Sequence, residues 1–299
     1  MNHRRPLFPP SYYEKLKNYK PPKKIYFSGP YRRQEWSFPD SIIHYITQKP
    51  STAKCYQNMI QCCKYFFAKN SILVFSNLRF FDTKWLIFNT FETLGIKIFD
   101  KKLWITDSIT VTNDARGKPN LISSIVVPKL YKCDAKNLHL GNQIISYKDF
   151  CFLAANVEKI DVYEGIVKHE DGSAVGFEKL VEALPKLKFI FYIFDKLNVT
   201  KKTVDELVKL PHFSKIDTFV LMKIPEALDI NALYAYMKKN KHTVFELDFD
   251  DSISAAYKAK LEAIIDETLE AKDRDYKPFF IQFPGLSREK LSELEDICR

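Results

Sequence analysis

The sequence predicts an α/β fold in which a small N-terminal helical unit precedes a solenoid of alternating strands and helices, with parallel strands. Strand-like and helix-like segments alternate from about residue 136 onward, and the clearest strand cores begin at Val157, Leu187, Phe213 and Val244, spaced 30, 26 and 31 residues apart. Each such unit exposes an apolar face that only its neighbour covers, so the units stack. An open doubly wound sheet shows the same alternation. The tight period and the lack of a Gly-rich phosphate-loop pattern favour the solenoid.

Composition excludes a disordered chain, because 46% of the 299 residues are hydrophobic and 28% are charged. No apolar run approaches the roughly 18 residues of a membrane helix, and the N-terminus has no apolar signal-peptide segment. The 6 cysteines form no CxxC pair, so we expect reduced thiols. These features predict a soluble chain with no membrane partner, located in the cytoplasm, the nucleus or both.

Residues 1–35 are expected to form a basic, Pro-rich flexible arm. They hold nine basic and two acidic side chains, a net charge of +7 out of +9 for the whole chain. Six prolines in this segment remove helix donors and favour extended backbone. Basic residues interleaved with tyrosines also occur in nucleic-acid-binding arms. A solvated leader is the preferred interpretation, and we do not expect a nucleic-acid partner.

Residues 36–70 are expected to form a small helical unit. Ser37 and Asp40 have the spacing of a capping box, and Ile42, Ile43 and Ile46 follow at the spacing of one helical face. Pro50 interrupts the chain, and a second helix is predicted from about residue 52 to 68.

The next two regions differ in how clearly they can be interpreted. Residues 71–135 contain short runs rich in Ile, Phe, Trp and Thr, which indicate strands in an irregular linking region joined to the array, but no topology follows from the pattern. Residues 136–299 contain the repeats. Their mean period of about 29 residues lies near the upper end of the range for leucine-rich repeats.

Several segments resemble a large nematode family of F-box-like proteins, in which an F-box precedes leucine-rich-repeat-like units. The F-box pattern is matched by Phe38-Pro39-x-x-Ile42-Ile43-x-x-Ile46 and by Ile60-x-x-Cys63-Lys64-x-Phe66. The narrower resemblance rests on PDSIIHYI, QCCKYFFAKN, PKLYKCDAKNL, NVEKIDVYE and KLVEALPKLK, and covers roughly residues 36 to 250. The resemblance implies a substrate-recognition subunit of a cullin-based (SCF-type) ubiquitin ligase.

The resemblance also implies two binding surfaces. A Skp-type adaptor protein would be bound by Phe38, Pro39, Ile42, Ile43 and Ile46. A protein target of unknown identity would be bound by the outward positions of the strands. If Ile160, Ile190, Ile216 and Leu247 point inward, these positions are Lys159, Asp161, Tyr163, Phe189, Phe191, Ile193, Lys215, Asp217, Phe219, Glu246, Asp248 and Asp250.

The search for catalytic chemistry gives no candidate. The 6 histidines fall in no HExxH or Cys/His spacing, and no GxSxG motif occurs. Asp248, Asp250 and Asp251 alternate near one strand end, where an acidic surface is far commoner than a cation site. We therefore expect no catalytic residue, no metal, no cofactor and no enzyme activity.

The resemblance thus implies a non-catalytic ubiquitin-ligase adaptor, which would belong to the Ubl conjugation pathway. The alternative is a ligase-independent protein–protein interaction or scaffold protein with a degenerate F-box. Oligomeric state and biological process are not predicted.

Overall fold

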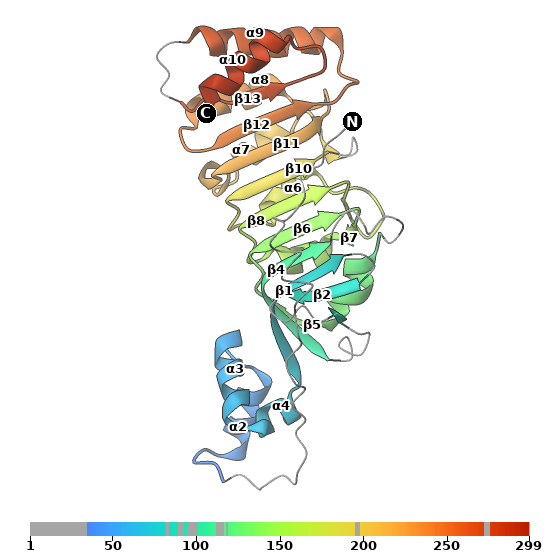
Figure 1. The fold of residues 1–299 in the computed structure, drawn as a ribbon, viewed down its shortest axis with the longest axis vertical. Coiled ribbons are helices and arrows are strands. Elements are labelled where there is room, and N and C mark those ends of the chain that lie inside the picture. The colour runs from blue at the N-terminus through green and yellow to red at the C-terminus, as the bar shows by residue number, and fades with distance from the viewer. Residues whose placement is uncertain are drawn as a thin grey trace, which may run out of the picture.

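The computed structural model describes residues 35–81, 84–88, 93–94, 101–111, 117, 119–194, 198–271 and 276–298. The predicted basic arm therefore lies outside the described residues, apart from Glu35. Figure 1 shows three short helices at one end of the molecule and a long ladder of strands above them. We refer to the three helices as the helical unit and to everything from β1 to α10 as the array.

The helical unit contains α2 (Asp40–Gln48), α3 (Ala53–Cys62) and α4 (Lys64–Lys69). The Thr52 hydroxyl caps α3 by accepting a hydrogen bond from the Cys55 N–H at 3.1 Å. The predicted capping box is wrong, because the residue before α2 is Pro39 and no side chain caps that helix. The predicted second helix is divided at Cys63, whose extended backbone (φ −151°, ψ 127°) ends α3 and begins α4.

In the described part of the chain the main sheet has 11 strands, in the order β13-β12-β11-β10-β8-β6-β4-β1-β2-β3, with β5 also beside β4. All neighbours are parallel except the β1–β2 and β2–β3 pairs. The strands are β1 (Ile72–Phe81), β2 (Lys84–Phe88), β3 (Thr93–Leu94), β4 (Lys102–Val111), β5 (Leu130–Cys133), β6 (Asn137–Gly141), β8 (Lys159–Tyr163), β10 (Phe189–Ile193), β11 (Thr218–Ile224), β12 (Val244–Phe249) and β13 (Phe280–Gln282). A second sheet pairs β7 (Ile144–Ser146) with β9 (Ile166–Lys168).

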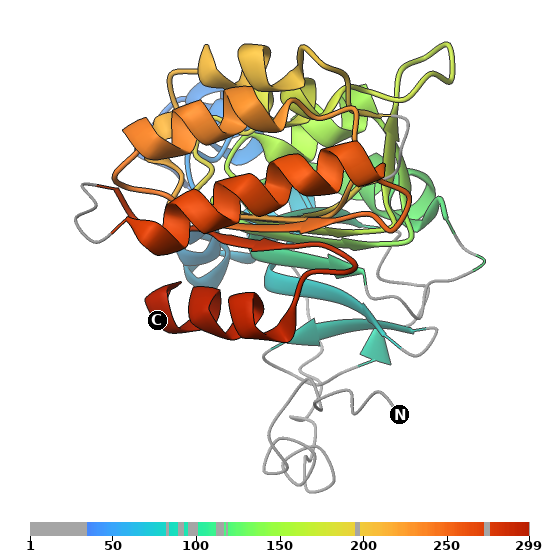
Figure 2. The same ribbon diagram turned by 90° about the horizontal axis from the view of Figure 1, so that it is seen from above.

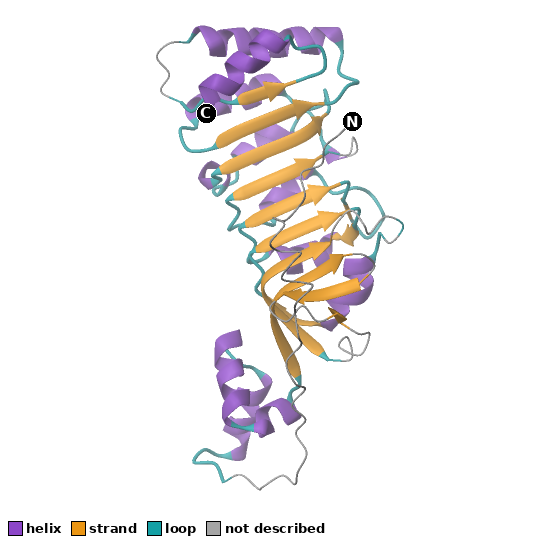
Figure 3. Cartoon of the chain, viewed as in Figure 1, coloured by secondary structure: helices purple, strands orange, loops and turns teal. Residues whose placement is uncertain are grey.

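The helices of the array follow the strands in sequence, and Figure 3 shows the resulting alternation. They are α5 (Tyr147–Ala154), α6 (Phe177–Glu182), α7 (Thr203–Val208), α8 (Ile230–Lys239), α9 (Ala255–Glu270) and α10 (Arg288–Cys298), with shorter turns at Ile122–Val126, Val127–Lys129 and Phe213–Lys215. Figure 2 shows that α5–α9 cover one face of the sheet, while α10 lies across the strands from them, at the β13 end. Ser146, Asp229 and Ser254 cap α5, α8 and α9 by accepting backbone hydrogen bonds.

The main core lies between the sheet and these helices. Alternate strand residues point into it, and the pairing register aligns them in rows across the sheet. One such row contains Leu138, Ile160, Ile190, Phe219 and Phe245, all buried. The predicted α/β class with mostly parallel strands is confirmed, and the strands of residues 71–135 join the same sheet through the β1–β4 and β4–β6 pairs. None of the helices in the described residues is long and apolar enough to cross a bilayer.

Candidate interaction surfaces

The first surface is an apolar stripe on the helical unit. Among the described residues, six large hydrophobic side chains are exposed, and four of them lie between residues 38 and 46. They are Phe38 (61% exposed), Ile42 (44%), Tyr45 (60%) and Ile46 (36%), which we call the α2 stripe. Because residues three and four apart share a helix face, Ile42, Tyr45 and Ile46 form one continuous strip. This strip faces away from the core of the protein.

Ile43 does not belong to the stripe, which corrects its assignment to the adaptor-binding set. The Ile43 side chain is only 5% exposed and packs inward together with Thr47, whose hydroxyl donates to the Ile43 carbonyl at 2.6 Å. The reason is helical geometry, since Ile43 lies about 100° around the axis from Ile42. Phe38, Ile42 and Ile46 are exposed as the prediction requires, and so is Pro39 at the start of the helix.

One tyrosine joins the helical unit to the array, a role that its sequence pattern does not indicate. The buried Tyr56 hydroxyl donates to the Asn70 carbonyl at 2.6 Å and accepts from the Ile72 N–H at 3.1 Å. Burial raises the pKa of this phenol, so it stays a donor. The Asn70 amide donates to the Thr47 carbonyl at 3.0 Å. Tyr56 therefore links all three helices to the first strand of the array.

The second surface is the sheet face opposite α5–α9, which we call the open face. The register places three residues of β8 on it (Lys159, Asp161 and Tyr163) and three of β10 (Phe189, Phe191 and Ile193), as predicted. The next strand, β11, contributes Thr218, Val220 and Met222. From β12 come Val244, Glu246 and Asp248.

The prediction for β11 is wrong by one residue. Phe219 is completely buried in the core rather than on the open face, because the strand begins at Thr218 and not near Phe213. Phe213 starts a single 3-10 turn that ends at Lys215. Lys215 and Asp217 are exposed, but they precede the strand and lie at its N-terminal edge instead of on the open face. One extra residue before a strand reverses the side to which every side chain points.

The centre of the open face is aromatic and apolar. The Tyr163 and Phe191 rings stack with centroids 4.9 Å apart, and the Lys159 ammonium lies 4.3 Å from the centre of the Phe189 ring. The carboxylate of Asp161 contacts the His139 Nδ1 atom across the β6–β8 pair. Asp161 is only 7% exposed, so its predicted role in target binding is corrected to a structural contact with His139.

The β12 end of the open face is acidic. Glu246 is exposed and Asp248 is half-buried. Burial raises the pKa of Asp248, and the nearby charge of Asp251 raises it further. Asp250 follows the strand and accepts hydrogen bonds from both the N–H and the hydroxyl of Ser252. Beside this acidic end an open groove of about 260 Å³ is lined by Val244, Phe245, Glu246, Pro278, Phe280, Glu295 and Cys298.

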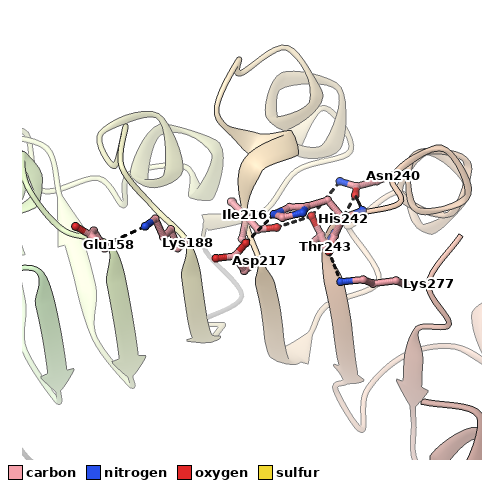
Figure 4. Close-up of polar contacts among 8 residues, drawn as sticks. All are labelled: Glu158, Lys188, Ile216, Asp217, Asn240, His242, Thr243 and Lys277. Carbon is pink, nitrogen blue, oxygen red and sulfur yellow. Dashed lines mark hydrogen bonds and ion pairs between the residues drawn. The ribbon is translucent and has the colours of Figure 1, made fainter. Parts of the chain in front are cut away.

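The N-terminal edge of the strands carries a row of polar contacts, shown in Figure 4. Glu158 pairs with Lys136 at 3.6 Å and with Lys188 at 3.4 Å, and these two ammonium groups lower the pKa of its carboxyl. Further along, Asp217 contacts the His242 Nε2 atom at 2.7 Å. Because each contact joins successive units of the array, we interpret this row as a device that fixes the strands in register.

Hydrogen bonds continue the same row, and those of Thr243 are buried. The Thr243 hydroxyl donates to the Ile216 carbonyl at 2.6 Å, and the Asn240 side-chain oxygen accepts from the Thr243 N–H at 2.9 Å. Lys277 donates to the His242 carbonyl at 2.6 Å. Asp217 thus belongs to a structural edge, whereas Lys215 ends the exposed turn before β11. The open face and the α2 stripe are the two candidate binding surfaces.

Comparisons add no family to this description. No protein-family model matches the chain, and no curated protein matches it. Within the described ranges, no three His, Cys, Asp or Glu side chains gather closely enough to hold a metal ion.

Proposed function

We propose that this chain is the substrate-recognition adaptor of a cullin-based (SCF-type) ubiquitin ligase. In this proposal the helical unit is an F-box-like module that docks on a Skp-type adaptor protein, and the array is a leucine-rich-repeat-like solenoid that holds a target protein. The site of action is the cytoplasm, the nucleus or both. The observation that carries the proposal is the α2 stripe.

Exposed side chains of this size and spacing favour a helix-binding partner. Leaving a Leu, Ile or Phe side chain in water instead of burying it costs about 1.5–3 kcal/mol. Three of the four stripe residues lie on one face of α2, whose opposite side is already buried, and Phe38 lies two residues before the helix. Amphipathic helices of this kind place i, i+3, i+4 and i+7 anchors into a partner's apolar groove. Aromatic and aliphatic anchors at the centre of an interface supply most of its binding free energy.

The mechanism requires no chemistry from the chain itself. Docking of the helical unit on the ligase and of a target on the array keeps the two at a fixed separation. The effective concentration of target lysines near the ubiquitin carrier rises accordingly, and transfer accelerates without a new catalytic group. The chain is therefore proposed to be a non-enzymatic component of the Ubl conjugation pathway.

A ligase-independent interaction protein is the second candidate, and one observation favours it. The F-box pattern assigns Ile43 to the adaptor contact, but its side chain is buried inside the helical unit. An α2 stripe without Ile43 offers a smaller apolar anchor set to a Skp-type protein. A weaker or absent adaptor contact would leave the open face as the functional surface.

The test is a pull-down of the full chain with a purified Skp-type adaptor. We compare the wild type with Ile42→Asp/Ile46→Asp, which places charges in the stripe. The matched control is Phe152→Asp/Val208→Asp, because these are the other two exposed large hydrophobics among the described residues and both lie on array helices. The proposal expects binding by wild type and control and loss in the stripe variant. Absence of binding by a folded wild type would support the second candidate.

A further inference from the structure

We propose that the open face binds an extended protein segment with an apolar or aromatic side chain followed, about three residues later, by Lys or Arg. This inference rests on the proposed function for its biological role, since it names the class of target that the array recognises. The binding itself needs no ligase component. Three features of the open face lead to it.

The first feature is an apolar centre on the side of the sheet that α5–α9 leave uncovered. Phe189, Phe191 and Ile193 of β10 are half-buried and point away from the helix-covered core, and Met222 of β11 is half-buried beside them. The neighbouring Tyr163 ring already stacks on Phe191. A rigid aromatic platform of this kind favours an apolar or aromatic side chain from a partner.

The second feature is a pair of carboxylates, Glu246 and Asp248, for which the described part of the chain supplies no cation. Of the described residues, none donates a hydrogen bond to Glu246 or Asp248 or forms an ion pair with them. By contrast, the carboxylates at β8 have partners: Glu158 pairs with Lys136 and Lys188, and Asp161 contacts His139. A half-buried carboxylate beside the charge of Asp251 is disfavoured in its ionised form, as the raised pKa of Asp248 indicates. A Lys or Arg from a partner relieves this imbalance.

The third feature is the distance between the apolar centre and the acidic pair. Phe191, Val220 and Glu246 are direct neighbours on adjacent strands. Two strand spacings separate Phe191 from Glu246, which is about 10 Å. An extended chain advances about 3.3 Å per residue, so the two partner side chains are about three residues apart. The bound segment crosses the strands instead of running along them.

The negative charge of the open face also disfavours binding of nucleic acid. A phosphate backbone is repelled by Glu246 and Asp248, and the Lys159 ammonium on β8 already lies over the Phe189 ring. A basic protein segment has the complementary charge and supplies the apolar side chain as well.

The test uses fluorescence anisotropy with the full chain and a labelled synthetic peptide of about twelve residues, built on a repeated Phe-Ser-Thr-Arg unit. A second peptide replaces each Arg by Glu. We expect the Arg peptide to bind, the Glu peptide to bind at least about tenfold more weakly, and affinity to fall as salt is raised. Equal binding of both peptides, or binding of neither, overturns the inference.

Variants locate the binding to the open face. Glu246→Gln/Asp248→Asn is expected to lower the affinity for the Arg peptide about tenfold. The control Glu170→Gln/Asp205→Asn neutralises two exposed acids away from the open face and is expected to leave this affinity unchanged. Unchanged binding in the first variant overturns the inference. If the Arg peptide binds only after the basic residues of segment 1–35 are changed to Gln, that segment is itself the occupant, and the assignment to a partner is overturned.

The same proteins separate this inference from the proposed function. Glu246→Gln/Asp248→Asn is expected to bind the Skp-type adaptor as the wild type does. A wild type that binds the adaptor but not the Arg peptide contradicts only the inference. Loss of adaptor binding by the wild type, with peptide binding retained, contradicts only the ligase role.

Discussion

The helical unit and the array bury their apolar side chains in different ways. In the array one continuous core runs from Leu78 on β1 to Leu294 on α10, between the sheet and its helices. The fully buried cluster at the helical unit contains only Tyr56, Ile72 and Trp104, and two of these belong to strands of the array. Three short helices have too little interior to bury both sides of α2. The difference explains why the largest exposed apolar side chains gather on the helical unit.

The array also has more polar contacts than the junction between the helical unit and the array. The array repeats its contacts from unit to unit along the N-terminal edge of the strands, as Glu158, Asp217 and Thr243 show. The helical unit is held to the array by a few hydrogen bonds, chiefly those of Tyr56 and that of the Tyr131 hydroxyl to the Gln48 carbonyl at 3.1 Å. We therefore expect substitutions in the array to affect global stability and those at the junction to act locally.

The largest effect is expected from a cavity in the array. Phe177 is completely buried, and its ring lies 4.9 Å from those of Tyr192 and Phe194. Phe177→Ala is expected to lower the free energy of unfolding by about 3–5 kcal/mol. Chemical denaturation measures this, with the exposed Phe152→Ala as control. A loss below about 1 kcal/mol for Phe177→Ala would contradict the description of the core.

A smaller and local effect is expected at the junction. Tyr56→Phe removes the hydroxyl that donates to Asn70 and accepts from Ile72. We expect a cost of about 1–3 kcal/mol for the two lost hydrogen bonds, although the Ile72 N–H keeps its bond to the Asn70 carbonyl at 2.9 Å. Hydrogen exchange is expected to quicken in α2–α4 and to stay unchanged in β8–β12. Tyr45→Phe, at an exposed position, serves as the control. Faster exchange throughout the chain would show that the two regions unfold as one.

The edge contacts are expected to contribute less. Thr243→Val keeps the volume of the side chain but removes the hydroxyl that donates to the Ile216 carbonyl and accepts from Asn240. We expect a loss of about 1–2 kcal/mol in thermal or chemical unfolding. Thr218→Val on the open face is the matched control and is expected to change stability by less than about 0.5 kcal/mol. Equal effects at both positions would contradict the structural role of the edge.

The smallest effect concerns pH. The pKa of Asp248 is raised above its ordinary 3.8, so the folded state loses stability as pH rises from the unfolded pKa through the folded one. Asp248→Asn removes this penalty and is expected to stabilise the protein at pH 7 by less than about 1 kcal/mol. The gain over wild type disappears below about pH 3.8. Melting of both proteins at pH 7 and near pH 3 measures the difference, and a destabilised variant at pH 7 would contradict the account of this carboxylate.

Local patterns predicted most strands and helices of residues 136–299, because apolar spacing along each segment reflects a single buried side. Local patterns did not predict which side of the sheet a side chain faces where this depends on the residue at which the strand begins. Phe219 was assigned to the wrong face because a 3-10 turn at Phe213–Lys215 resembles the start of a strand. The topology of residues 71–135 was not predictable, since β1 pairs in parallel with β4 about 30 residues later, and such pairing leaves no local signal.

The candidate surfaces were predictable to a similar extent. Ile42 and Ile43 are adjacent in the sequence and equally apolar, and only the packing of α2 decides which one faces outward. Tyr56 lies within the predicted second helix, but its role depends on the position of Asn70 and Ile72 after folding. The imbalance at Glu246 and Asp248 required knowledge of which carboxylates have partners across neighbouring strands.

The most direct test of the central claim is hydrogen exchange of the full chain with and without a saturating Skp-type adaptor. The claim is that the helical unit, through the α2 stripe, is the docking surface, and that the array stays available for a target. We predict slower exchange confined to residues 38–48, with the amides of β8–β12 unchanged. Slower exchange on the open face with α2 unchanged, or no change at full saturation, would contradict it.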